Sequence, residues 1–340
     1  MSNKKYDVAV VIGRFQPFHN GHLMLLKKAE ELANRVVVLV GSANVAESIK
    51  NPFCYPVRRQ MILEGWNDNK VEYAVKPLND YTYNEQRWIT QVQRSIVGPW
   101  SDYPEKVVLV GHTKDESSYY LRNFPDWDYF EVTREVDLNA TDIRDVLFTK
   151  PIEYLQGVVP FAVFNELRFW RASDSFKELL DEYSFIKQYK DSWKAAPYAP
   201  TFVTVDAVVV QQGHVLMIRR GAAPGKGLRA LPGGFLDQNE TLIDGMIREL
   251  REETGLKIPE KVLKGSVVEQ RVFDSPGRSA RGRTITVAYY IELEVPLDAK
   301  LPRVKGGDDA AKAEWVALGS LKGEECFEDH FSIIDSFVGA

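Results

Sequence analysis

The stretch Gly234–Leu256, GFLDQNETLIDGMIRELREETGL, predicts a turn that leads into an amphipathic helix. A Pro-Gly-Gly sequence stands at its start, so the chain turns sharply there. Apolar residues then recur at helical spacing from Leu242 to Leu250. Gly255 follows, and a glycine just past the last turn commonly ends a helix. We therefore expect one loop followed by one helix.

Three glutamates share one face of this helix. Glu249 lies three residues before Glu252 and four before Glu253, so their side chains are neighbours. Like charges repel, which gives a fold little structural reason to group them. Clustered carboxylates are, however, the ligands that hard divalent cations prefer. The alternative is a solvated acidic face that Arg248 and Arg251 balance.

The spacing of this stretch resembles the Nudix box, with Gly234, Glu240 and RELREETGL at residues 248–256 in the defined positions. The resemblance implies a Nudix hydrolase with an α/β/α fold and a mixed sheet, which cleaves a diphosphate linked to another group. Bound metal ions would neutralise the diphosphate and lower the pKa of an attacking water. Glu240 would support the loop or the metal, and Arg248 would hold a glutamate. The implied ligands of Mg²⁺ (or Mn²⁺) are Gly234, Glu249, Glu252 and Glu253.

Length and composition limit the possible classes of protein. A chain of 340 residues favours two domains, and the net charge of −5 argues against a broad nucleic-acid surface. Cys54 and Cys326 lie far apart, which suggests neither a disulfide framework nor a zinc site and fits a cytoplasmic protein. The sequence has no apolar core of a signal peptide before Gly13 and no run of about 18 apolar residues, so we expect no membrane contact. A homo-oligomer stays open.

The first half of the chain alternates between buried strands and helices. Tyr6–Ile12 reads as a buried parallel strand, Leu23–Leu32 as a helix and Val36–Val40 as a second strand. The loop GRFQPFHNGH, residues 13–22, follows the first strand, and ligands of such sheets bind at the carboxyl ends of the strands. Further strands are expected at Val71–Val75, Val107–Val110 and Tyr129–Val132, which together predict a doubly wound, Rossmann-like α/β domain.

Two histidines stand in that loop. His19 and His22 have the spacing that lets both face one ligand at the start of a helix, where imidazoles and the helix dipole favour phosphate oxygens. The alternative is a pair of capping or packed histidines. A zinc site is disfavoured because no third ligand is spaced nearby.

The same loop resembles the (H/T)xGH signature of the nucleotidyltransferase superfamily, and in its wider sequence the archaeal-type nicotinamide-mononucleotide (NMN) adenylyltransferases. Asn139-Ala-Thr141-Asp-Ile143-Arg144 resembles the SxTxxR motif of that superfamily, with Asn139 where serine is usual. The resemblance implies that ATP transfers an adenylyl group to NMN, which gives NAD and pyrophosphate. Arg144 would sit at a helix start and hold the triphosphate.

Further roles come from the same resemblance. Asp80 and Trp88 match positions that contact the nicotinamide nucleotide, Trp88 by stacking on its ring, while a core position is the alternative for Trp88. Arg58 is implied to reach the phosphates, with Arg59 as the alternative. The implied catalytic set is His19, His22, Arg58 and Arg144, and the other implied substrate-binding residues are Gly13, Arg14, Phe15, Gly111 and Thr141.

The remainder of the chain divides into a connection and a second domain. Residues 151–195 lack strand patterns and are expected to close a first domain of residues 1–195 with helices; residues 196–200 form a linker and residues 201–340 the second domain. In the second domain we expect strands at Thr201–Val210, Val215–Ile218, Val262–Val272 and Ile285–Val295, a closing helix or strand from Gly306–Trp315, and a terminal helix at Glu324–Phe337.

The loop FDSPGRSARGRT, residues 273–284, resembles the DxPxRDPRG loop of ADP-ribose-pyrophosphatase-like Nudix proteins, although Ser279 replaces the second acidic residue. Arg278 and Arg281 would clamp a diphosphate, and a solvated basic loop tip is the alternative. The resemblance implies cleavage of ADP-ribose to AMP and ribose 5-phosphate. The general base stays open among Glu253, Asp308 and Asp309.

Two other functions stay open. The Nudix domain could sense a pyridine-nucleotide metabolite or act on another nucleoside diphosphate derivative. The first domain could use another acceptor, such as nicotinic acid mononucleotide or phosphopantetheine.

Overall fold

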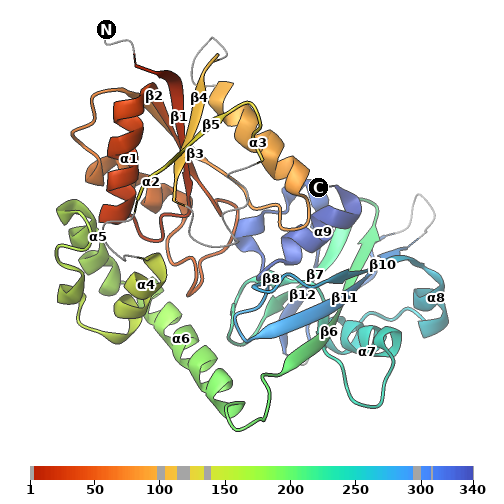
Figure 1. Cartoon of the computed structure of the whole chain (residues 1–340). Coiled ribbons are helices and arrows are strands. Elements are labelled where there is room, and N and C mark those ends of the chain that lie inside the picture. The colour runs from red at the N-terminus through yellow and green to blue at the C-terminus, as the bar shows by residue number, and fades with distance from the viewer. Residues whose placement is uncertain are drawn as a thin grey trace. The chain divides into compact units, whose positions relative to one another are not determined.

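The computed structural model of the chain describes residues 4–97, 104–112, 123–133, 139–293, 300–307 and 309–339. The chain divides into two compact units, Met1–Leu180 and Asp181–Ala340, which we describe separately (Figure 1). The division falls within helix α6 (Asp174–Ser192), before the linker expected at residues 196–200, so the predicted domain boundary stays a prediction. Within the ranges that the structure describes, no helix combines the length and the apolar character needed to cross a membrane.

The first unit is built on a parallel sheet of five strands in the order β3-β2-β1-β4-β5. Val10 of β1 is paired with Val37 of β2 on one side and with Leu109 of β4 on the other. This arrangement confirms the predicted doubly wound fold. The strands are β1 (Tyr6–Gly13), β2 (Ala33–Val40), β3 (Glu72–Pro77), β4 (Val107–Gly111) and β5 (Asp128–Glu131).

Helices cover both faces of this sheet, and Figure 1 shows α1 and α3 on opposite sides of it. Alternate residues of β1 explain the two layers, because Ala9 and Val11 belong to the core beneath α1 and α2, whereas Val8 and Val10 belong to the core beneath α3. The helices of this unit are α1 (Asn20–Leu32), α2 (Tyr55–Gly65), α3 (Glu85–Val97), α4 (Ala140–Thr149), α5 (Phe161–Arg171) and the first part of α6; a 3₁₀ turn, η2, spans Ile152–Leu155.

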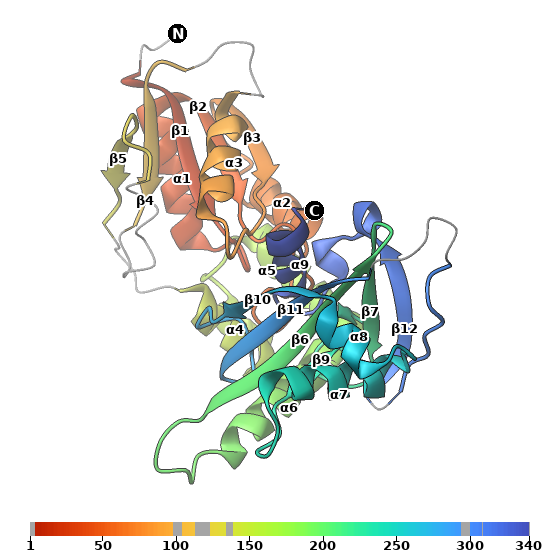
Figure 2. The ribbon, with the colours of Figure 1, turned by 90° about the vertical axis from the view of Figure 1, so that its right-hand side faces the viewer.

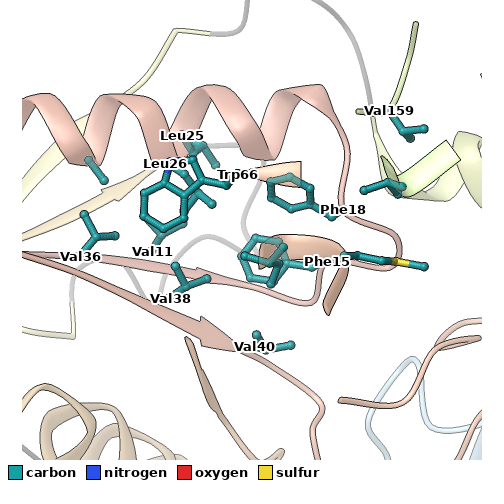
Figure 3. Close-up of a cluster of buried hydrophobic side chains, with 14 of the residues drawn as sticks. Val11, Phe15, Phe18, Leu25, Leu26, Val36, Val38, Val40, Trp66 and Val159 are labelled. Atoms are coloured by element: carbon teal, nitrogen blue, oxygen red, sulfur yellow. The ribbon is translucent and has the colours of Figure 1, made fainter. Parts of the chain in front are cut away.

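The loop between β1 and α1 is held by two buried phenylalanines. Phe15 and Phe18 are 1% and 0% exposed and lie among apolar side chains from β1, β2 and α1 (Figure 3). Phe15 adopts a positive φ of 52°, a conformation that needs support from its surroundings. The loop that carries the two histidines is therefore part of the core.

The second unit contains a mixed sheet in the order β10-β11-β6-β7-β12, with β8 paired to β7 and β9 to β6. The long β11–β6 pair, whose strands lie side by side in Figure 2, is parallel, and the other pairs are antiparallel. The mixed sheet agrees with the predicted Nudix fold. The strands are β6 (Thr201–Gln211), β7 (His214–Arg220), β8 (Arg229–Ala230), β9 (Gly233–Phe235), β10 (Val267–Phe273), β11 (Arg283–Glu292) and β12 (Ala310–Ala317).

Two predicted elements of this unit were wrong at their starts. The strand expected from Val262 begins only at Val267, because Pro259 caps a short helix before it. The terminal helix expected from Glu324 begins only at His330, because Glu328 has a positive φ of 46°, which a helix does not allow. The helices are α7 (Leu242–Thr254), α8 (Glu260–Gly265) and α9 (His330–Val338), with 3₁₀ turns η3 (Leu318–Ser320) and η4 (Gly323–Glu325).

Helix α7 has the bounds that the sequence indicated. The Thr241 side chain caps it by accepting a hydrogen bond from the Asp244 backbone N–H, and Gly255 ends it at a φ of 59°. Met246 and Leu250 are fully buried in the core with β6 and β11. Burial of this apolar stripe fixes the rotation of α7 and thereby the direction of its glutamates.

Candidate active sites

The strand order places the first candidate site. β1 and β4 are neighbours at the point where the strand order reverses, and ligands of open α/β sheets bind outside the carboxyl ends of such strands. β1 ends at Gly13 and β4 at Gly111, whose carbonyl accepts a hydrogen bond from the Val132 N–H at 2.9 Å. The loop expected after Gly111 lies, from residue 113 to residue 122, outside the described residues.

His19 and His22 lie together at the start of α1, with ring centroids 3.7 Å apart, and form a capping box there, so the capping alternative is present and their contact with a ligand stays a prediction. The His19 backbone N–H donates to Nδ1 of His22 at 3.3 Å, which leaves the proton of a neutral His22 ring on Nε2. Burial, together with the neighbouring His19 and His112, holds the pKa of His22 well below its ordinary value. At neutral pH, His22 therefore offers one uncharged N–H donor. His112 follows the predicted substrate-binding Gly111 at the end of β4, and no separate role was predicted for it from the sequence.

Cationic side chains gather near these histidines. Arg144 donates from Nη1 to the Gln16 carbonyl at 2.9 Å and from Nη2 to the Thr141 hydroxyl at 3.1 Å. Burial and the nearby Arg14 lower the pKa of Arg144 to about 10. The pKa of Lys50 is likewise lowered by burial and by the nearby Arg14 and Arg144, whereas Asp80 acts to raise it. Clustered cations that destabilise one another suit a polyanion such as triphosphate. The sequence reasoning missed Lys50.

Arg58 occupies a different place from the one expected. Its side chain is buried, and its guanidinium donates to the carbonyls of Arg14, Gly41 and Ser42 at 2.8, 2.6 and 2.9 Å. These bonds tie together the chain after β1 and the chain after β2. They suit a positioning residue, so phosphate contact by Arg58 stays a prediction. The neighbouring Arg59 is exposed and remains the alternative.

Asp80 and Trp88 lie in different surroundings. The Asp80 carboxylate accepts from the Ser42 N–H at 3.1 Å and from the Ser42 hydroxyl at 2.6 Å, which joins the ends of β2 and β3. Trp88 is half-buried and packs against the core beneath α3, with its ring 6.3 Å from that of Phe124. Trp88 thus occupies the core position that was the alternative to nicotinamide contact. Its stacking on nicotinamide stays a prediction.

The second candidate site is a pocket of about 290 Å³ in the second unit. The register of the β6–β9 pair determines where the pocket lies. Gly233 pairs with Asp206 and Gly234 with Val205, so the glycine turn lies directly beside β6. Gly233 has no room for a side chain, because a methyl group there would stand 2.2 Å from the Val205 carbonyl oxygen. Residues from β6, β9, α7, the loop at 274–282 and the segment at 327–330 line the pocket.

Arg248 organises the glutamates of the Nudix box. It forms two hydrogen bonds to the Glu240 carboxylate, at 3.0 and 2.7 Å, which agrees with the glutamate-holding role that the resemblance implied. Its Nη1 also donates to Glu249 at 2.9 Å and to Glu252 at 3.1 Å. These partners raise its pKa further.

Glu253 is the buried member of the cluster. Its carboxylate accepts a hydrogen bond from the Gly233 N–H at 2.9 Å, and burial raises its pKa to about 8. The buried Asp206 stands nearby, bonded to the Thr286 hydroxyl at 2.5 Å, and burial raises its pKa as well. Two carboxyls that resist ionisation at one site are suited to a divalent cation. Asp206 was missed, although one carboxylate within a valine-rich strand was a visible signal.

The glutamate carboxylates of α7 can bind a metal ion only after they give up some of their present hydrogen bonds. Among the described residues, no three His, Cys, Asp or Glu side chains are already arranged as metal ligands. Two of the glutamates, Glu249 and Glu252, are bonded to Arg248 instead. Oxygen ligands are nevertheless in place, because the Glu249 carboxylate lies against Gly234 and Glu253 against Gly233. Hard cations such as Mg²⁺ and Mn²⁺ prefer such ligands.

The two arginines of the loop at 274–282 differ in what they contact. Arg278 forms two hydrogen bonds to Asp329, at 2.9 and 2.8 Å, with both side chains almost fully buried. The Arg281 guanidinium lies 5.0 Å from the centre of the Phe235 ring, and its Nε has no hydrogen-bond acceptor in the described residues. Both arginines line the pocket, and they differ in that Arg278 is bonded to Asp329 whereas Arg281 has a buried Nε without an acceptor among the described residues.

Three further residues line the pocket. Arg220, which the sequence reasoning missed, stacks 4.1 Å over the Phe327 ring and donates from Nε to the Pro224 carbonyl at 2.7 Å. Glu328, also missed, is half-buried and contributes a carboxylate to the lining. Of the alternative general bases, Asp309 lines the pocket and Asp308 lies outside the described residues.

Comparison with known families agrees with both sites. A model described as cytidylyltransferase-like matches residues 10–146, and a model described as NUDIX domain matches residues 200–337. A nicotinamide/nicotinic acid mononucleotide adenylyltransferase of Acinetobacter baylyi is 34% identical over 181 residues, which are 53% of this chain and 94% of that protein. An ADP-ribose pyrophosphatase of Methanocaldococcus jannaschii is 35% identical over 149 residues, which are 44% of this chain and 80% of that protein.

One similar solved structure spans both units. A bifunctional NMN adenylyltransferase/ADP ribose pyrophosphatase of Francisella tularensis, crystallised with AMP and a Mn ion, has 35% identity and a TM-score of 0.89. The match covers 98% of this chain and 99% of that chain. The family resemblance inferred from the two motifs is thereby confirmed, and the chain belongs to the family of bifunctional NMN adenylyltransferase/ADP-ribose pyrophosphatases.

Proposed function

We propose that the chain is an enzyme of NAD metabolism with two activities. The first unit transfers the adenylyl group of ATP to NMN, with release of pyrophosphate. The second unit hydrolyses ADP-ribose to AMP and ribose 5-phosphate with a divalent metal. The observation that carries the proposal is the presence of both phosphate-chemistry sites in one chain whose whole length matches a bifunctional relative.

In the first unit the reaction needs positioning more than acid–base chemistry. The phosphate oxygen of NMN attacks the α-phosphorus of ATP, so the nucleophile is already anionic and requires no general base. The neutral His22 donates from Nε2 to an oxygen that gains charge at phosphorus, and Arg144 and Lys50 supply positive charge for the triphosphate. Pyrophosphate leaves with the bonding electrons of the broken P–O bond.

In the second unit the pocket binds and orients a diphosphate. A bound divalent ion supplies a water of lowered pKa and neutralises phosphate charge. Glu249, Glu252 and Glu253 would hold that ion, and Glu249 and Glu252 would then exchange their present bonds with Arg248 for it. Arg281 donates to the diphosphate, while the aromatic rings of Phe235 and Phe327 give the pocket two apolar surfaces. Glu253 and Asp309 remain candidates for the general base.

Several finer points are part of the same proposal. Mg²⁺ is the metal we favour, with Mn²⁺ able to replace it, because both accept several carboxylate oxygens. We place the protein in the cytoplasm, since neither Cys54 nor Cys326 forms a disulfide. The partners are the small molecules ATP, NMN and ADP-ribose.

Product analysis on the purified full chain with Mg²⁺ tests the proposal. ATP with NMN should give NAD, and ADP-ribose alone should give AMP. NAD without AMP would contradict the hydrolytic half and point to a sensor or to another nucleoside diphosphate derivative. AMP without NAD would contradict the acceptor and call for nicotinic acid mononucleotide and phosphopantetheine in its place.

A further inference from the structure

Three consecutive residues before and at the start of α9 bond to both loops that line the hydrolytic pocket. The Glu328 carboxylate accepts from the Ala280 N–H at 3.1 Å, and the Asp329 carboxylate accepts two bonds from Arg278. Nδ1 of His330 accepts from the Leu231 N–H at 2.8 Å. One short segment thus fixes the loop at 274–282, which we call the arginine loop, and the turn that leads to Gly233.

The backbone conformation of Glu328 allows the segment to make these contacts. Glu328 holds a φ of 46°, in the left-handed region that residues other than glycine rarely adopt. Such conformations persist where surrounding contacts enforce them, and they gather at functional sites. At Glu328 the conformation keeps the carboxylate in the pocket while the next residue reaches Arg278.

The two arginines of the arginine loop make different contacts. The Arg278 side chain is 3% exposed, and its Nε and Nη2 are committed to Asp329. Arg281 lies over Phe235 and has a buried Nε with no acceptor in the part of the chain that the structure describes. A buried donor without a partner is costly, and a ligand oxygen would remove that cost.

We propose that Glu328, Asp329 and His330 form a clasp that positions the arginine loop, so that Arg281 contacts the phosphates of the substrate while Arg278 serves as the anchor of the loop. Arg220, which also lines the pocket and stacks on Phe327, supplies a second positive charge for the same anion. In this arrangement Asp329 acts on the substrate only through Arg278. The inference rests on the proposed hydrolysis of ADP-ribose.

The direction of the change in KM distinguishes this clasp from direct contact by Arg278. If Arg278 bound the substrate, Asp329→Asn would free its guanidinium and leave KM unchanged or lower. The clasp predicts the reverse, since the arginine loop loses its anchor: KM for ADP-ribose should rise about tenfold with kcat within about twofold. Arg281→Gln should raise KM by at least as much. An unchanged or lower KM for Asp329→Asn would overturn the proposal.

Glu328→Gln is a second and milder variant. It removes the charge near Arg281 and keeps an acceptor for the Ala280 N–H, so folding should be preserved. The clasp predicts a higher KM, whereas a lower KM would mean that Glu328 only competes with substrate for Arg281. Glu324→Gln is the matched control, because Glu324 is an exposed carboxylate that lies four residues before Glu328, outside the clasp, and the KM of this variant should equal that of the wild type.

Hydrogen exchange tests the clasp without substrate. Glu328→Gly removes the carboxylate while glycine accepts the positive φ freely, and exchange in the peptide at 274–282 should become about tenfold faster. Unchanged exchange would overturn the clasp. A wild-type protein that does not hydrolyse ADP-ribose would instead refute the proposed function, and the exchange result would still decide whether the segment holds the loop.

Discussion

Gly234 and Glu249 lie so close that a methyl group on Gly234 would stand 2.5 Å from the Glu249 Oε1. The glycine of the Nudix turn is therefore a spacing requirement as well as a turn former. Its absent side chain leaves the room in which the Glu249 carboxylate approaches the backbone of β9. Any side chain at position 234 must move the carboxylate that we assign to the metal.

Gly234→Ala should lower ADP-ribose hydrolysis by about a hundredfold, the range seen when one preorganised electrostatic group of an active site is lost. NAD formation should be unchanged. Gly265→Ala is the control, since a methyl group there meets nothing within 4 Å. Steady-state rates of AMP release decide the matter, and a Gly234→Ala protein with wild-type hydrolysis would refute the spacing argument.

Arg58 and Arg59 should separate into a structural and a substrate-contacting residue. Arg58→Lys loses at least two buried hydrogen bonds to backbone carbonyls and should destabilise the first unit by about 2–3 kcal/mol. Arg59→Lys should leave stability within about 0.5 kcal/mol, because Arg59 is exposed. Urea unfolding of each variant, followed by tryptophan fluorescence, measures the two changes in the free energy of unfolding.

The KM for ATP completes this comparison. A rise for Arg59→Lys, at unchanged stability, would identify Arg59 as the phosphate contact. If Arg58→Lys kept full stability yet lost turnover, our assignment of Arg58 as a positioning residue would be wrong.

The sequence was most informative where one motif defined both an element and its chemistry. The helix at Leu242–Thr254 was predicted with its end at Gly255 because the apolar rhythm and the glycine agree. The order of the five parallel strands was not predictable from the rhythm, since each strand only shows that it is buried. The structure supplies that order, and with it the place of the loop after Gly13.

The sequence was least informative about which partner a charged residue takes. Arg58, Arg278 and Arg281 look alike in sequence, yet Arg58 binds carbonyls, Arg278 binds Asp329, and Arg281 has a buried Nε without an acceptor among the described residues. Asp329 lies 51 positions from Arg278, and local patterns carry no information about such a pair. The start of the last helix was missed for a similar reason, because the positive φ of Glu328 depends on tertiary contacts.

His330 should make the second unit sensitive to acid. Burial lowers its pKa to about 3, whereas the unfolded chain has the ordinary value near 6.5. Between these values the unfolded state binds a proton that the folded state does not, so stability is constant above pH 6.5 and falls as the pH decreases below it. From pH 6.5 to pH 5 the expected loss is about 1.6 kcal/mol.

Urea unfolding of the wild type and of His330→Gln at both pH values tests this expectation. Glutamine offers an acceptor to the Leu231 N–H but does not titrate, so the variant should lack this part of the pH dependence. Equal pH dependence in the two proteins would show that His330 is not the acid-sensitive group.

The most direct test of two active sites in one chain is a reciprocal pair of variants, each assayed for both products. His22→Ala removes the neutral donor and should lower NAD formation about a hundredfold, with AMP release from ADP-ribose unchanged. Glu253→Gln removes the buried carboxylate of the Nudix helix and should abolish AMP release while NAD formation is unchanged. Loss of both products in either variant would contradict two independent sites, and retention of both would contradict the assigned residues.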